Sequence, residues 1–317
     1  MGSETLPVIF LMGPTASGKT ELALALHEVL PLEIISADSA MVYRGMDIGT
    51  AKPDRVILAR APHHLIDICD PAESYSAGRF QVEARALIDA IHARNRIPLL
   101  TGGTGLYFRS LEHGFSEIPP AEPAIRERIL RLALTDGWHA LHEQLARVDP
   151  DSAARIHEND PQRIQRALEV FEITGRPLSE SFSGGRHRPL PHRIIKLVIN
   201  PLDRNIIHER IMLRFHRMIE LGLVDEVRPL YERGDLTPAM PSMRMVGYRQ
   251  VWRYLENRLD YKTMQEHAII ATRQLAKRQL TWLRSERSAI WLDSTSQNVT
   301  QSVLKILQSD PTFCTEL

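Results

Sequence analysis

The chain has 317 residues, of which 43% are hydrophobic, and its acidic and basic side chains balance to a formal net charge of zero. This length allows one large domain or two, with a full core. No run of about 18 apolar residues predicts a membrane-spanning helix, and the N-terminus has no signal-peptide pattern. The two cysteines, Cys69 and Cys314, lack metal-binding spacing. We therefore expect a cytoplasmic protein with reduced thiols and no membrane partner.

The basic residues are unevenly distributed along the chain. Only six of the 39 are lysines, and the other 33 are arginines, the residue type favoured for phosphate contacts and for stacking on bases. Between Arg244 and Arg287, ten basic residues stand against four acidic ones. Such a stretch fits a polyanionic partner bound to one face of the protein. A solvated, arginine-rich helix surface explains it equally well.

The first third of the chain alternates between strand-like and helix-like patterns. Apolar runs typical of buried parallel strands occur at residues 8–12, 32–36, 64–68, 97–101 and, further on, 193–199. Helical spacing of apolar residues follows at 21–30 and 76–94. This rhythm predicts an α/β fold, in which helices flank an open parallel sheet that binds ligands at the carboxyl ends of its strands.

A different pattern begins near residue 118. A proline-rich linker at 118–123 leads into a nearly continuous helical pattern that extends to residue 175, and a stretch rich in Gly and Pro follows at 183–189. We therefore predict an all-helical insertion domain at 121–190. The α/β core would then comprise 1–120 and 191–317, and its longest later helices would cover 205–221 and 261–284.

The most specific motif directly follows the first apolar run. It has the spacing of a phosphate-binding loop (P-loop) and comprises Gly13, Pro14, Thr15, Ala16, Ser17, Gly18, Lys19 and Thr20. Since a strand precedes it and a helix follows, the core is expected to be P-loop NTPase-like. Backbone amides and the helix N-terminus would surround a phosphate, while Lys19 would neutralise its oxygens and Thr20 would hold Mg²⁺. The motif does not indicate whether the phosphate compound is hydrolysed, transferred or expelled.

Polar residues also follow two other predicted strands. Asp38 comes at the end of the second run, beside the phosphate loop of such a sheet. There it could bind Mg²⁺ through water, accept a proton from a nucleophile or cap a turn. The Gly102–Gly105 segment, which carries the Thr104 hydroxyl, allows close approach of a ligand or makes a tight turn. The polar loop at 47–53 is expected to lie over a site, where Lys52 could meet phosphate or solvent.

Three further blocks combine basic residues with polar or aromatic ones. The first opens a helix of the expected insertion and contains Gln162, Arg163, Ile164, Gln165 and Arg166. The second contains Arg244, Met245, Val246, Gly247, Tyr248 and Arg249. The third contains Lys277, Arg278, Gln279, Leu280, Thr281, Trp282, Leu283 and Arg284. Basic residues interleaved with aromatics suit RNA backbones and unstacked bases. Exposed helix faces and core aromatics explain the blocks as well, and for Trp282 the core is favoured.

Taken together, the motifs resemble those of the tRNA dimethylallyltransferase family. The matching blocks lie, in family order and over nearly the whole chain, at 13–20, 38–39, 47–53, 102–104, 160–166, 244–249 and 277–284. A phosphate loop alone is weak evidence, whereas seven ordered blocks are highly specific. One departure is Met41, which stands where many members carry Gln, so a side-chain hydrogen bond from this position is in doubt.

The resemblance implies transfer of a dimethylallyl group from dimethylallyl diphosphate to the N6 amine of adenosine 37, directly 3′ of the anticodon in tRNA, with release of diphosphate. The P-loop and Mg²⁺ would bind the diphosphate. Asp38 would be the general base, and Thr104 and Lys19 would also be catalytic. Arg214, with Arg217 as the second choice, would clamp the diphosphate.

The resemblance also implies how the tRNA anticodon stem-loop binds. The adenine must leave its stack to reach the site, and the residues expected to hold it are Asp38, Ser39, Ala40, Met41 and Thr104. The three basic blocks, together with Arg126, would grip the stem-loop. The helical insertion would close over the RNA, and the protein is expected to act as a monomer.

Three other functions remain open on the residues alone. A small-molecule kinase would use the same loop for ATP but leaves the basic stretch unexplained. A prenyltransferase of free nucleotides would need neither the RNA-binding blocks nor the insertion. An RNA-binding protein could use the loop as a nucleotide switch. An ATPase usually ends a buried strand in a carboxylate that holds Mg²⁺ and orients water, but the 97–100 run ends in Thr101-Gly102.

Overall fold

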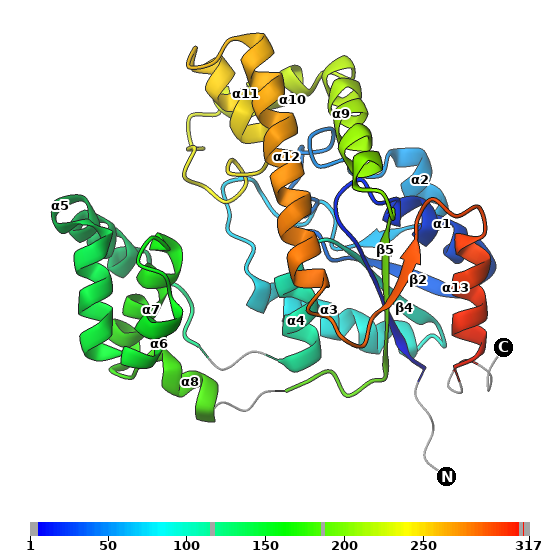
Figure 1. Ribbon diagram of the computed structural model, residues 1–317, viewed down its shortest axis with the longest axis horizontal. Coiled ribbons are helices and arrows are strands. Elements are labelled where there is room, and N and C mark those ends of the chain that lie inside the picture. Colours follow the sequence, from blue (N-terminus) through cyan, green and yellow to red (C-terminus); the bar gives the residue numbers. More distant parts are fainter. Residues whose placement is uncertain (1–5, 115–117, 185–187, 311–312, 314–317) are drawn as a thin grey trace. The chain divides into compact units, whose positions relative to one another are not determined.

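The computed structural model describes residues 6–114, 118–184, 188–310 and 313, and these form two compact units (Figure 1). Unit 1 comprises Met1–Glu112 and Leu190–Leu317, and unit 2 comprises His113–Pro189. Unit 2 begins somewhat earlier than the expected insertion at 121–190. Cys69 is a free, buried thiol, while Cys314 and part of the 183–189 stretch lie outside the described residues.

Unit 1 is built on a parallel sheet. Within the described residues the strands are arranged in the order β3-β2-β4-β1-β5-β6. They span β1 Val8–Met12, β2 Leu32–Ser36, β3 His63–His64, β4 Ile97–Gly102, β5 Ile194–Asn200 and β6 Ile290–Asp293. Every neighbouring pair is parallel, so the carboxyl ends of all strands meet at one edge. This confirms the predicted α/β fold.

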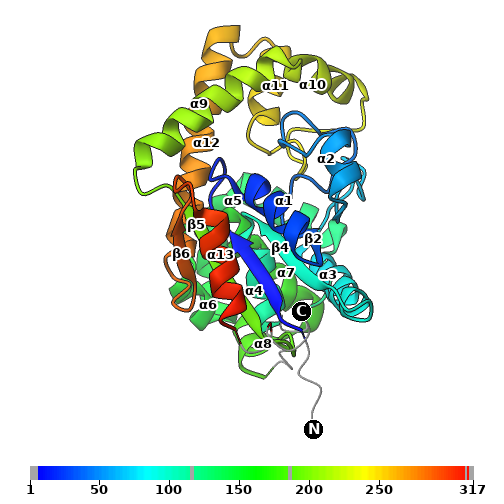
Figure 2. The same cartoon turned by 90° about the vertical axis from the view of Figure 1, so that its right-hand side faces the viewer.

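The two faces of the sheet bury two hydrophobic clusters, because side chains alternate along each strand. Ile9 and Leu11 of β1 face helices α1 (Lys19–Val29) and α13 (Val299–Gln308), and Figure 2 shows α13 lying over the sheet. Val8, Phe10 and Met12 of β1 face α3 (Ala77–His92) and α4 (Gly105–His113). With both faces covered, the central strand β1 is apolar and buried throughout, as its sequence predicts.

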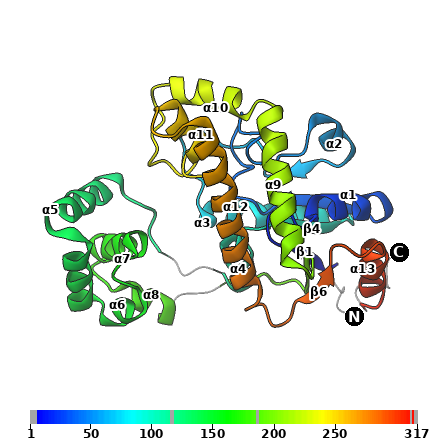
Figure 3. The ribbon, with the colours of Figure 1, turned by 45° about the horizontal axis from the view of Figure 1, so that its top comes forward.

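The remaining helices of unit 1 include α2 (Arg55–Arg60) and a group that follows β5. That group comprises α9 (Arg204–Glu220), α10 (Leu223–Glu232), α11 (Tyr248–Leu255) and α12 (Tyr261–Leu283). Helices α9 and α12 pack side by side (Figure 3). Both begin at an aspartate whose carboxylate caps the first turn, Asp203 for α9 and Asp260 for α12.

Unit 2 contains only helices among its described residues: α5 (Pro123–Val148), α6 (Pro150–Arg155), α7 (Pro161–Thr174) and α8 (Leu178–Gly184). Helix α7 starts as its sequence predicts, because the Asp160 carboxylate accepts the Arg163 amide at 3.1 Å and Pro161 occupies the first turn. It ends at Gly175, whose φ of 69° is a left-handed cap. The helices bury their own core around Ile129, Leu145 and Ile164.

The observed strands differ from the predicted ones in two places. The strand expected at 64–68 is only His63–His64, because Leu65 and Asp67 have positive φ angles of 62° and 57° and turn the chain away from the sheet. Conversely, β6 was not predicted. It lies at the edge of the sheet, and two of its four residues are exposed. Its apolar run, Ile290–Leu292, is shorter than the run that marks a buried strand.

Candidate active site

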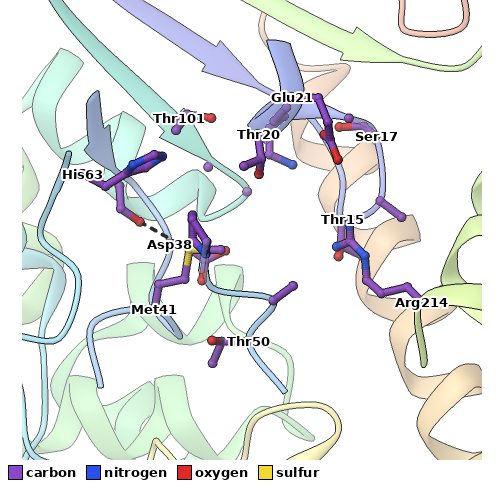
Figure 4. Close-up of a pocket in the computed structure, with 18 of the residues that line it drawn as sticks. Thr15, Ser17, Thr20, Glu21, Asp38, Met41, Thr50, His63, Thr101 and Arg214 are labelled. Carbon is purple, nitrogen blue, oxygen red and sulfur yellow. Dashed lines mark hydrogen bonds between the residues drawn. The ribbon is translucent and has the colours of Figure 1, made fainter. Parts of the chain in front are cut away.

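A cleft lies at the carboxyl edge of the sheet, where the loops after β1, β2 and β4 meet α9 and α12 (Figure 4). Its narrow part is lined by Thr15–Glu21, with Asp38 opposite. Its wider part encloses about 1270 Å³ including the open mouth. The two parts share the lining residues Thr15, Asp38, Thr50, Ala51, Gly103, Arg214 and Gln279. The cleft therefore joins the phosphate loop to a larger chamber.

The phosphate loop has the geometry that its sequence predicts. Gly18 has a φ of 94°, which places it in the left-handed region just before α1. The next residue, Lys19, directs its ammonium group back across the loop and donates to the carbonyl oxygens of Gly13 at 2.9 Å and Pro14 at 2.7 Å. The Lys19 charge and the start of α1 therefore line the same narrow part of the cleft, a combination that favours an anion.

The charges in the narrow part of the cleft are weakly solvated. Burial lowers the pKa of Lys19 to about 8, although the nearby Asp38 carboxylate acts in the opposite direction. Burial likewise lowers the pKa of Arg214, which reaches from α9 toward Thr15 (Figure 4). Two cations held close together in a poorly hydrated pocket favour an anionic ligand such as a diphosphate.

Asp38 lies just after β2, in a loop that two hydrogen bonds hold in place. Its Oδ1 accepts the Ala40 amide at 2.8 Å, while the next residue, Ser39, donates its amide to the Thr104 hydroxyl at 3.1 Å. The Asp38 carboxylate thus both caps its own turn and lines the cleft. Met41 also lines the narrow part, and its sulfur accepts the Ser36 hydroxyl at 3.8 Å rather than providing a strong polar contact.

The loop at 47–53 forms another wall, to which it contributes Thr50 and Ala51. Glu226 of α10 holds it, because its carboxylate accepts the amides of residues 47, 48 and 49 at 2.9, 2.7 and 3.1 Å. Tyr248 donates its hydroxyl to the same carboxylate at 2.5 Å. Sequence reasoning missed Glu226, since an acidic residue in a helix carries no local signal of this role.

Lys52 does not meet the cleft. Its side chain is only 3% exposed and its ammonium lies 2.5 Å from the carboxylates of both Asp47 and Asp67. It also donates to the Tyr43 carbonyl at 2.9 Å. Lys52 therefore holds the loop together through these bonds. It neither contacts a phosphate site nor extends into solvent, the two roles expected from the sequence.

The wider part of the cleft combines apolar and cationic walls. Helix α9 supplies Ile211, Phe215 and Met218, and α12 supplies Leu275. From the second and third basic blocks, the residues that line it are Arg244, Met245, Val246, Gly247, Arg278 and Gln279. The adenine-holding residues expected from the sequence are also present here, namely Asp38, Ser39, Ala40 and Thr104.

Other expected residues lie away from the cleft. Arg217 is exposed and pairs with Glu220 at 3.0 Å, so Arg214 is the candidate clamp. Tyr248 and Leu283 are completely buried and present no surface to RNA. Trp282 of α12 packs against Phe108, with 6.2 Å between the two ring centroids, which agrees with its expected core role. Further members of the two blocks do not line the cleft: Arg249, Lys277, Thr281 and Arg284 are exposed, and Leu280 is half-buried.

In unit 2, the expected RNA-binding block is divided. Ile164 is completely buried in the unit's core and cannot reach RNA. Arg126 and Arg166 both bind the buried Glu169, at 2.9 and 2.6 Å, and Gln165 donates to the Arg126 carbonyl at 3.1 Å. Gln162 and Arg163 are exposed at the start of α7.

The oxygen ligands near the phosphate loop are too few to bind Mg²⁺ alone, but they could bind it together with a substrate phosphate. The Thr20 hydroxyl and the Asp38 carboxylate line the same part of the cleft. No group of three His, Cys, Asp or Glu side chains elsewhere in the described residues could hold a metal ion. Mg²⁺ commonly takes few protein ligands and completes its shell with water and substrate phosphate oxygens, so the residues present fit that ion.

A family model and curated relatives match most of this chain. The family model described as IPP transferase matches residues 41–286. A tRNA dimethylallyltransferase of Nitrosococcus oceani is 59% identical, covering 90% of this chain and 91% of the relative. One of Thioalkalivibrio sulfidiphilus is 60% identical, covering 88% and 87%.

Solved structures are similar over almost the whole chain. The tRNA isopentenylpyrophosphate transferase of Bacillus halodurans has a TM-score of 0.69 at 36% identity and covers 96% of this chain and 94% of that one. A eukaryotic dimethylallyltransferase acting on tRNA has a TM-score of 0.79 at 28% identity, covering 95% and 78%. None of the helices in the described part of this chain is long and apolar enough to cross a membrane. The chain belongs to the IPP transferase family, together with these tRNA dimethylallyltransferases.

Proposed function

We propose that this protein transfers a dimethylallyl group from dimethylallyl diphosphate to the N6 amine of adenosine 37 in tRNA and releases diphosphate. The observation that carries the proposal is the continuity of the cleft, since the phosphate loop and the chamber lined by Arg244 and Arg278 share Asp38 at their junction. Membership of the prenyl-transferring family gives the reaction class. The protein would act as a monomer in the cytoplasm.

The chemistry assigns one task to each polar group. The N6 lone pair attacks the allylic carbon as the bond from that carbon to the diphosphate oxygen breaks, and the diphosphate leaves with the bonding electrons. Asp38 accepts the proton that the amine loses. Because its Oδ1 is already held by the Ala40 amide, the carboxylate is oriented before the substrate arrives. Thr104 acts by fixing the backbone beside it.

The leaving diphosphate carries several negative charges, which the phosphate loop would stabilise. The backbone amides at the start of α1, the Lys19 ammonium and the Arg214 guanidinium would contact its oxygens. Mg²⁺, held by Thr20 together with the diphosphate, would offset charge as the leaving group departs. The apolar side chains of Ile211, Phe215 and Met218 would exclude water from the allylic group.

The RNA side of the proposal rests on the wider chamber. An adenine must be unstacked to enter it, and the chamber is large enough to admit a base. Arg244 and Arg278, which line the chamber, would act as cations for flanking phosphates. In unit 2, the exposed Gln162 and Arg163 are the remaining members of the expected RNA-binding block.

The test is transfer of radiolabelled dimethylallyl groups to an unmodified anticodon stem-loop, with AMP and ATP as acceptors in parallel. We expect label in the stem-loop, and loss of that label when the adenosine beside the anticodon is changed to guanosine. Label in AMP instead would identify a nucleotide prenyltransferase. Consumption of ATP without prenyl transfer would overturn the proposal in favour of a kinase or a nucleotide switch.

A further inference from the structure

Gln279 of α12 forms a bridge between two loops of the site. Its Oε1 accepts the amide of Thr15 in the phosphate loop at 2.8 Å, and its Nε2 donates to the carbonyl of Gly103 at 3.1 Å. The Thr15 amide can only donate and the Gly103 carbonyl can only accept. These two partners therefore fix which side-chain atom of Gln279 is the oxygen and which is the nitrogen. Gln279 also belongs to the junction of the two parts of the cleft.

The bridge depends on a close approach between α12 and the loop after β4. A Cβ atom on Gly103 would lie 2.2 Å from Gln279 Nε2, and one on Gly105 would lie 2.6 Å from the ring of Trp282. Gln279 and Trp282 are three residues apart, so they project from the same face of the helix. Gly103 and Gly105 therefore allow contact with α12, whereas the sequence suggested ligand approach or a tight turn for this segment.

From Gly103 the connection continues to the proposed base. Thr104 accepts the Ser39 amide at 3.1 Å through its hydroxyl, and its own amide donates to the Ala37 carbonyl at 3.3 Å. Asp38 lies between those two anchored residues. A continuous path of hydrogen bonds and short backbone segments thus runs from the phosphate loop through Gln279 to Asp38.

We propose that Gln279 is a positioning residue that sets the separation between the diphosphate loop and the loop carrying Asp38. The inference rests on the proposed prenyl transfer, in which the leaving diphosphate and the attacking amine must lie on opposite sides of one carbon. Errors of about 1 Å in such an arrangement cost up to about 10²-fold in rate. Gln279 was expected from the sequence to contact tRNA, and the bridge gives it a different task.

Gln279→Met tests this role, because methionine keeps the length and volume of the side chain and removes both hydrogen bonds. The matched control is Gln274→Met, on an exposed position of the same helix. We expect kcat to fall about 10- to 100-fold in Gln279→Met. The dissociation constants of inorganic diphosphate and of the stem-loop should stay within about twofold of the wild type, and the control should match the wild type throughout.

Other outcomes would overturn the inference. A rise confined to the KM for dimethylallyl diphosphate would make Gln279 a substrate ligand, and a parallel loss of stability and of both binding affinities would make it a structural tie only. Normal kcat would remove it from the mechanism. If the wild type and the control both fail to transfer the label, the proposed function is wrong, and this result is distinct from failure of Gln279→Met alone.

A double-mutant cycle with Gly103→Ala provides a second readout. The added methyl group would collide with Gln279 Nε2, so Gly103→Ala should itself break the bridge and lower kcat. Gln279→Ala should lower kcat when made alone but cause little further loss when added to Gly103→Ala, because both changes remove the same connection. Losses of kcat that multiply in the double variant would show independent roles and would contradict the inference.

Discussion

The arginines of the two units show how one residue type serves two purposes. In unit 2, Arg126 and Arg166 converge on Glu169, which is completely buried. In unit 1, Arg244 and Arg278 line the cleft, and no carboxylate in the described part of the chain pairs with them. An arginine satisfied by an internal carboxylate holds the fold, whereas one that faces a cleft unpaired is available for a phosphate. All four were expected to bind tRNA.

The electrostatics of Glu169 support this division. Burial acts to raise its pKa, but hydrogen bonds from Arg166, Arg126 and the Glu122 amide outweigh it and leave the pKa lowered. The carboxylate is therefore charged and needs both arginines.

Removing the carboxylate at the centre of the cleft should separate chemistry from binding. We expect Asp38→Ala to lower turnover by roughly 10²-fold or more, because the attacking amine would lose its proton acceptor. Stem-loop affinity, measured by filter binding, should remain nearly intact. Near-normal turnover would disprove the general-base assignment, and a large loss of RNA affinity would place Asp38 with the binding residues.

Removing the carboxylate at the centre of unit 2 should affect stability instead. Glu169→Ala leaves two partly buried guanidinium groups and the Glu122 amide without their acceptor, which should destabilise unit 2 by about 2 kcal/mol. Hydrogen exchange over α5 and α7 in the full chain measures this loss. Glu127→Ala removes an exposed pair with Arg131 and should change little. Unaltered exchange in Glu169→Ala would show that the arginines are not held by this residue.

The arginines themselves should differ in the salt dependence of RNA binding. Arg278→Ala should weaken stem-loop binding and reduce the slope of log K against log salt by about one unit, as loss of one phosphate contact does. Arg166→Ala should lower stability and leave that slope unchanged. If the two variants gave the same slope, the comparison between paired and unpaired arginines would fail.

A change at Tyr248 tests whether a buried member of a basic block affects RNA binding indirectly, by anchoring a loop of the site. Tyr248→Phe removes only the hydroxyl that donates to Glu226 and should cost about 1 kcal/mol of stability. Because the loop at 47–53 would lose part of its anchor, we also expect a several-fold higher KM for the stem-loop. The control is Tyr231→Phe, whose ring packs against Trp252. An unchanged salt slope in Tyr248→Phe would separate it from Arg278→Ala.

The smallest effect is a pH dependence of stability that comes from Glu33 on β2, the strand that precedes Asp38. Hydrogen bonds from Arg94 and His64 outweigh burial and lower the pKa of Glu33 from 4.5 to about 2. The stabilisation from this depressed pKa is present above pH 4.5 and is lost as the pH falls toward 2. The stability difference between wild type and Glu33→Gln, measured by urea unfolding, should therefore shrink over that range. A difference that stays constant would contradict this assignment.

Much of the core could be predicted because its signals are local. A continuous apolar run is enough to identify β1 or β4, since a strand covered on both faces buries every side chain. The cap at Asp160 likewise depends on residues within one turn. The edge strand β6 was missed because its pairing depends on distant segments. The predicted β3 was too long because Leu65 and Asp67 have positive φ angles, which are uncommon for residues other than glycine.

Local spacing and periodicity were enough to predict the phosphate loop, the parallel sheet and the place of Asp38 after a strand, because these features depend on residues close together in the chain. The tertiary structure decided which arginines face the cleft, that Tyr248 and Ile164 are buried, and that Glu226 and Gln279 hold the surrounding loops. The physical reason is that a long polar side chain can serve a ligand, solvent or another residue equally well. Its partner is chosen by segments far away in the chain, such as Gln279 and Thr15, which are 264 positions apart.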